Sequence, residues 1–83
     1  MAKHKYTVGE KEKHNITVNW SILSKHLTIE IDGEKMVDKF HYSPAPEKFE
    51  YELGGSEKHL VEISAGGFSA VKLFVNGEEL QQN

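Results

Sequence analysis

The chain has 83 residues, of which 37% are hydrophobic and 28% are charged, and its formal net charge is −3. This length allows one domain with a small core, and the absence of cysteine excludes disulfides and thiolate metal sites. All ten basic residues are lysine, which argues against nucleic-acid binding, because that function favours arginine and clustered positive charge.

The start of the chain lacks the apolar stretch of a signal peptide, and no run of residues is long enough to span a membrane. We therefore expect a cytoplasmic domain that has no cofactor and no membrane partner. We expect it to be a monomer or a weak homodimer.

The first half of the chain shows the alternation of polar and apolar residues that is typical of half-buried strands. Ile16, Val18 and Trp20, for example, fall on one face of a predicted strand. Asp32-Gly33 predicts a two-residue hairpin turn, because both positions of a type I′ turn need a positive φ. The predicted strands of this half cover residues 4–8, 14–20, 26–32 and 35–42.

The two prolines of the segment 43–46 mark a connection, since proline cannot donate to a sheet ladder. After it the same pattern returns, and Asn76-Gly77 predicts a second tight hairpin. The two turns would pair Ile29 with Met36 and Leu73 with Leu80, apolar against apolar. The predicted strands of this half cover residues 48–53, 58–65, 69–76 and 78–82.

The two halves are an internal repeat. Residues 5–24 align with 50–69, and 26–36 align with 70–80, with eight identities in 31 positions. A repeat this short cannot easily bury its apolar face alone, so the two should share one core. We predict an all-β fold over residues 1–83: an antiparallel β-sandwich or flattened barrel of about eight strands with pseudo-two-fold symmetry. Its parts are repeat one (about 4–42), the connection (43–46) and repeat two (about 47–83).

His14 and His59 are equivalent in the repeat, and their alternation places both on the inward face at the start of a strand. A two-fold axis could bring them together as two ligands of one metal ion. A metal site needs three or four ligands, however, and no carboxylate is placed by spacing to complete it. The simpler alternative is a pair of histidines at the rim of the sandwich.

Leu60 and Phe74 fall on the outward face of repeat two, whereas their counterparts Asn15 and Glu30 are polar. An exposed apolar patch of this kind often marks a protein contact. Alternatively, the N-terminal strand, the proline-rich connection or the C-terminal tail covers these two side chains. An edge strand such as 35–42 or 78–82 could also pair with a strand of a partner.

Catalysis is not indicated. The chain has no Gly-x-Ser-x-Gly elbow around its serines, and no pair of carboxylates is placed for acid–base work. The glycine pairs Gly54-Gly55 and Gly66-Gly67 are not followed by the Lys-Ser/Thr of a phosphate loop.

The segment Gly67–Leu80, with its Gly-Phe turn, long strand, Asn-Gly turn, charged pair and leucine, resembles the end of a domain of the Fas apoptotic inhibitory molecule family. The opening His14-Asn15-Ile16 and the strand from Leu27 to Gly33 are similar to that family as well. The resemblance covers about residues 13–80. It implies a compact, non-enzymatic β-sandwich that acts through protein contacts.

From the residues and the resemblance together we expect a protein-interaction module whose partner is an unknown protein. The alternative is a small-ligand or metal-binding domain that uses the interface between the repeats.

Overall fold

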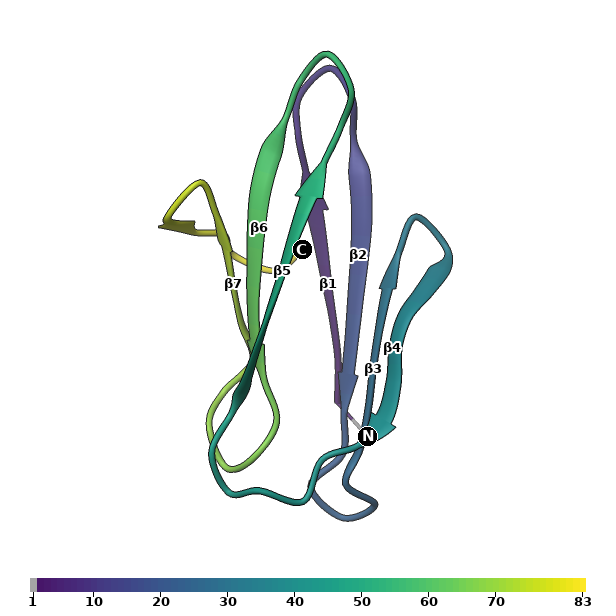
Figure 1. Ribbon diagram of the computed structural model, residues 1–83, viewed down its shortest axis with the longest axis vertical. Coiled ribbons are helices and arrows are strands. Elements are labelled where there is room, and N and C mark those ends of the chain that lie inside the picture. The colour runs from purple at the N-terminus through teal and green to yellow at the C-terminus, as the bar shows by residue number, and fades with distance from the viewer. Residues whose placement is uncertain (1) are drawn as a thin grey trace.

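The computed structural model describes residues 2–83, and they form two antiparallel sheets of four strands each (Figure 1). Both sheets are simple meanders in which each strand pairs with the next one in sequence. The expected all-β sandwich is thereby confirmed. The first sheet contains β1 (Ala2–Val8), β2 (His14–Trp20), β3 (His26–Ile31) and β4 (Glu34–Phe40), and the second contains β5 (Glu47–Leu53), β6 (His59–Ala65), β7 (Lys72–Val75) and β8 (Glu78–Glu79).

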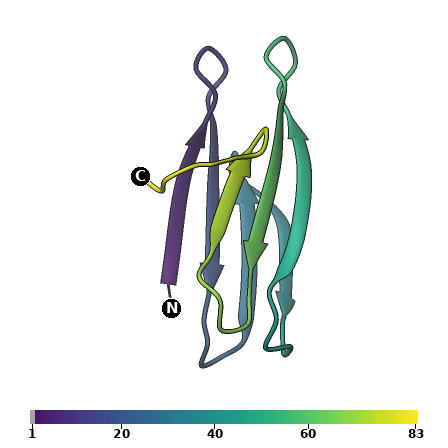
Figure 2. The same ribbon diagram turned by 90° about the vertical axis from the view of Figure 1, so that its left-hand side faces the viewer.

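Each sheet is built from one of the two repeats, and the proline-rich connection joins them. Figure 2 shows the hairpins β1–β2 and β5–β6 at one end of the molecule and the connections β2–β3, β4–β5 and β6–β7 at the opposite end. The molecule is elongated, with extents of 39 × 23 × 19 Å. Pseudo-two-fold symmetry between the repeats stays a prediction.

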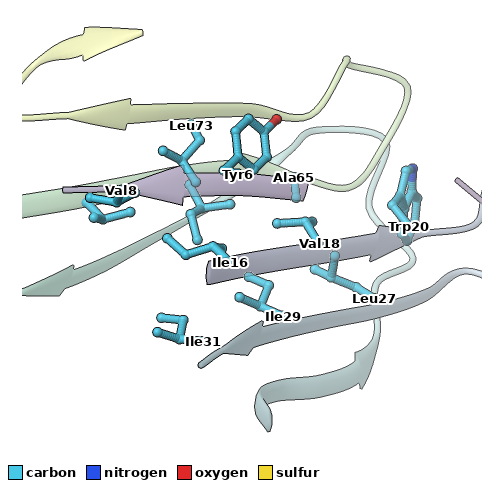
Figure 3. Close-up of a cluster of buried hydrophobic side chains, with 12 residues drawn as sticks. Tyr6, Val8, Ile16, Val18, Trp20, Leu27, Ile29, Ile31, Ala65 and Leu73 are labelled. Atoms are coloured by element: carbon cyan, nitrogen blue, oxygen red, sulfur yellow. The ribbon is translucent and has the colours of Figure 1, made fainter. Parts of the chain in front are cut away.

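The core lies between the two sheets, where the alternate residues of each strand meet (Figure 3). β-Branched and aliphatic side chains dominate it, as a pleated surface favours. The fully buried residues with the largest side chains are Val8, Ile16, Val18, Leu27, Ile29, Val61, Ile63 and Leu73.

The strands β7 and β8 are shorter than the predicted ranges 69–76 and 78–82. Gly66 and Gly67 both have a positive φ, and the chain runs in a loop until Lys72. After Glu79 the chain leaves the second sheet, and the amide of Asn83 donates to the carbonyl of Lys5 in β1 (2.8 Å). The C-terminal tail thus covers part of the β1 edge.

The pairing of Ile29 with Met36 is wrong. The Asp32-Gly33 turn pairs Ile31 with Glu34 as expected, but a bulge shifts the ladder, and Ile29 lies opposite Val37. The bulge inserts Met36 as an extra residue, so its side chain is 42% exposed while Val37 packs against the core. In the second repeat the expected pairing of Leu73 with Leu80 is present, and the amide of Leu80 donates to the carbonyl of Leu73 (2.8 Å).

Candidate functional site

Leu60 and Phe74 both lie on the outer face of the second sheet, as the alternation predicts. Leu60 is in β6, and Phe74 in β7 lies opposite Glu62, two residues further along β6. They are therefore diagonal neighbours on one face, within reach of each other's side chains. Leu60 is 49% exposed, and Phe74 is half-buried.

Charged side chains surround these two residues in rows across the sheet. The register places Lys48, Ser64 and Lys72 side by side in one row. The next row holds Phe74 together with three glutamates: Glu50, Glu62 and Glu79. A shallow groove of about 330 Å³ runs between the two rows and is lined by Lys48, Glu62, Ser64, Lys72, Phe74 and Gly77.

The sequence suggested three segments that could cover Leu60: the N-terminal strand, the proline-rich connection and the C-terminal tail. None of them does. β1 belongs to the other sheet, the C-terminal tail turns toward Lys5, and the connection 43–46 lies at the opposite end of the sandwich (Figure 1). Within residues 2–83, Leu60 thus stays open to solvent, whereas Phe74 beside it is half-buried. This face is what we call the Phe74 face, defined by Leu60, Phe74 and the two charged rows.

The two histidines are held by separate carboxylates. His14 Nδ1 lies 2.7 Å from Asp32 Oδ2 at the end of β3, and His59 Nε2 lies 2.8 Å from Glu57 Oε1 in its own hairpin. The other ring nitrogen of each, His14 Nε2 and His59 Nδ1, is buried and has no hydrogen-bond partner. A carboxylate behind a histidine is typical of metal ligands, but residues 2–83 contain no group of three or more possible ligands.

The carboxylates that hold these rings are themselves strongly hydrogen-bonded. The His14 side chain and the Asn15 amide lower the pKa of Asp32 below its usual value. The amides of Glu10 and Lys11 and the His59 side chain lower the pKa of Glu57. Both carboxylates are therefore fixed in the charged form at neutral pH.

Sequence reasoning did not find a second exposed apolar region, at the end of the sandwich away from the hairpins β1–β2 and β5–β6. Three connections meet there, residues 21–25, 41–46 and 66–70, and we call them together the loop end (Figure 2). The indole Nε1 of Trp20, the last residue of β2, donates to the Gly67 carbonyl (3.1 Å) and ties the end of that strand to the connection 66–70. A small cavity of about 170 Å³ between them is lined by Trp20, Lys25, Tyr42, Ser43, Pro44, Gly67 and Phe68.

The sequence does carry a signal for the loop end. Across its 16 residues the only charged side chain is Lys25. The three segments are more than 15 residues apart in the chain, however, and only the fold shows that they meet.

No family model, curated protein or solved structure matches the chain. The similarity to the Fas apoptotic inhibitory molecule family therefore stays a prediction from residues 13–80. No helix in residues 2–83 is long and apolar enough to cross a membrane.

Proposed function

We propose that this protein is a non-enzymatic interaction module that binds a partner protein through the Phe74 face. The observation that supports this function is that Leu60 is half-exposed beside Phe74 and no segment of residues 2–83 covers it. In the first sheet the equivalent positions hold Asn15 and Glu30, so exposure of apolar groups here is not required by the fold.

The composition of the Phe74 face suits a protein partner. Interfaces commonly have an apolar centre and a polar rim, and here Phe74 lies in the glutamate row, between the lysine row and Leu60. The lysine row and the glutamate row would orient a partner that carries the opposite charges. With two apolar anchors, the contact belongs to the small, transient class of interfaces.

The test compares Leu60→Ala/Phe74→Ala with a matched control, Met36→Ala, which removes a similarly exposed apolar side chain from the other sheet. Partners isolated from lysate with the wild-type chain would be purified and titrated by calorimetry. We expect the double variant to lose about tenfold or more in affinity, since interface anchors typically contribute more than about 1 kcal/mol each. Equal affinity of the double variant and the wild type, for every partner and for self-association, would exclude this face.

Binding of a metal ion or small ligand at the interface between the repeats is the second candidate function. It is supported by the two buried, unpartnered nitrogens of His14 and His59. Zinc titration of the protein, followed by the NMR signals of the five histidine rings, would test it. If a metal binds there, we expect shifts confined to the ring signals of His14 and His59. Unchanged ring signals together with no heat of binding would exclude metal binding at this interface.

A further inference from the structure

Charge is distributed unevenly along the long axis of the molecule. The hairpin tips at one end, residues 9–13 and 54–58, contain six charged residues, three of them glutamates. The loop end, at the other extreme, has one lysine and no acidic residue in 16 positions. At the chain's average of 28% charged residues, a stretch of that length would carry about four or five.

The loop end also carries the three most exposed large apolar side chains of residues 2–83: Leu23 is 96% exposed, Tyr42 75% and Phe68 74%. Ile22, in the same connection as Leu23, is 50% exposed. They come from three different connections, so they form a set of protruding tips with only a small cavity between them. Apolar surface gathered in this way is rare on soluble domains unless it contacts something.

The backbone of the loop end is ordered by its own hydrogen bonds. The amide of Lys25 donates to the Ser21 carbonyl (2.8 Å), and the amide of His41 donates to the Lys25 carbonyl (2.8 Å). The amide of Phe68 donates to the Pro44 carbonyl (3.1 Å), which joins two connections. These hydrogen bonds hold the three connections in place, so the protruding side chains are presented from a fixed backbone.

We propose that the loop end is a peripheral membrane-binding site, which inserts Leu23, Phe68 and their neighbours shallowly into an electrically neutral lipid surface. A fluid phase accommodates protruding tips from three loops without a matching shape. Tyr42 has the amphipathic ring that favours the headgroup level. The flexible Lys25 side chain, whose Nζ lies 5.5 Å from the centre of the Phe68 ring, can extend to a headgroup phosphate.

The charges of the loop end and of the whole chain favour binding to a neutral lipid surface over binding to an anionic one. One lysine provides little attraction to anionic lipid, and the net charge of −3 opposes approach to it. Insertion along the long axis would hold the charged hairpin tips farthest from the membrane (Figure 1). Apolar burial therefore has to supply most of the affinity.

This site is separate from the Phe74 face. It uses residues of the connections, whereas Leu60 and Phe74 lie on the strands β6 and β7. The failure of one proposal therefore leaves the other standing.

The experiment measures binding of the full chain to phosphatidylcholine vesicles by sedimentation. Trp20 is the only tryptophan and lines the loop-end cavity, so quenching of its fluorescence by lipid brominated near the headgroup reports on this end of the molecule. The test variant is Leu23→Ser/Phe68→Ser, and the control variant is Leu60→Ser. Both change exposed side chains, and thermal unfolding would establish that each variant is folded.

We expect the wild type and Leu60→Ser to bind the vesicles with quenching of Trp20. The Leu23→Ser/Phe68→Ser variant should bind at least about tenfold more weakly, because the apolar contact of two side chains is lost. Three results would overturn the proposal: no binding by the folded wild type, equal binding by the double variant, or binding that requires anionic lipid and disappears at about 0.5 M salt. Capture of a protein by the loop end without vesicle binding would also overturn it, and would assign the loop end to a protein partner.

Discussion

At the scale of single residues, the turns show how directly local chemistry sets the backbone. The Asx-Gly pairs were predicted to need a positive φ at both positions. The structure has φ of 52° and 82° at Asp32 and Gly33, and of 50° and 87° at Asn76 and Gly77. The side chains of Asp32 and Asn76 also accept the amides of Asn15 and Leu60, respectively. Each turn thereby ties its hairpin to the neighbouring strand.

The adjacent residues Gly54 and Gly55 give a matched pair for testing a glycine requirement. Gly54 has a φ of 99°, and a Cβ there would fall on the carbonyl oxygen of Glu57. Gly55 has no positive φ, and a Cβ there would meet no atom within 4 Å.

We expect Gly54→Ala to lower the free energy of unfolding by about 1–3 kcal/mol, since it forces an unfavourable backbone and a clash. Gly55→Ala should change it by no more than about 0.5 kcal/mol. Urea unfolding of the two variants checks this. Equal destabilisation by both would contradict the assigned strain at Gly54.

At the scale of elements, the bulge in β4 could not be predicted from the alternation of polar and apolar residues. Residues 35–42 alternate well enough to predict a strand, but nothing local indicates that Met36 is an extra residue. Packing decides it, because the shift places Val37 against the core opposite Ile29. The bulge also disrupts an open edge strand, which is a common protection against edge-to-edge pairing.

The hairpins β1–β2 and β5–β6 exchange carboxylates at their tips. The Glu12 carboxylate accepts the amides of Gly55 (3.1 Å) and Ser56 (3.0 Å) as well as the Ser56 hydroxyl. In return, the Glu57 carboxylate accepts the amides of Glu10 (2.8 Å) and Lys11 (3.2 Å). Glu12 and Glu57 are equivalent in the repeat, so each repeat caps the hairpin of the other.

This exchange predicts acid sensitivity. The Ser56 hydroxyl, followed by the amides of Gly55 and Ser56, lowers the pKa of Glu12 from 4.5 to about 2. A carboxylate with a lowered pKa stabilises the folded state above its unfolded pKa, and this stabilisation is lost as the pH falls through the folded value. The contribution of Glu12 is therefore complete above pH 4.5 and disappears toward about pH 2.

We expect Glu12→Gln to have a lower Tm than the wild type at neutral pH, with a difference that shrinks steadily between pH 4.5 and about 2. Calorimetric scans across this range check it. The control is Glu52→Gln, which changes an exposed glutamate of β5 away from the hairpin tips and should leave the Tm close to that of the wild type. If the Tm difference between Glu12→Gln and the wild type did not depend on pH, the charge of Glu12 would not contribute to the stability of the folded state.

At the scale of the whole molecule, the two sheets bury one shared core and leave the two ends with different chemistry. The hairpin tips are charged and joined to each other, whereas the loop end is apolar with a single lysine. The expectation of no membrane partner was based on the absence of a spanning segment. A search for a membrane-spanning segment cannot find a peripheral membrane-binding site such as the one proposed at the loop end. The loop end forms only where three connections that are distant in the sequence meet.

The sequence by itself determined the order of the strands, the extents of all but β7 and β8 to within a few residues, the two Asx-Gly turns, the sandwich class and the outward position of Leu60 and Phe74. These follow from period-two alternation and from turn residues, which are local properties of the chain. Only the tertiary structure decided the bulge at Met36, the separate carboxylate partners of His14 and His59, the course of the C-terminal tail and the loop end. The pairing of His14 with Asp32, the course of the tail and the loop end depend on contacts between residues far apart in the chain, and spacing along the sequence does not encode which distant groups will meet.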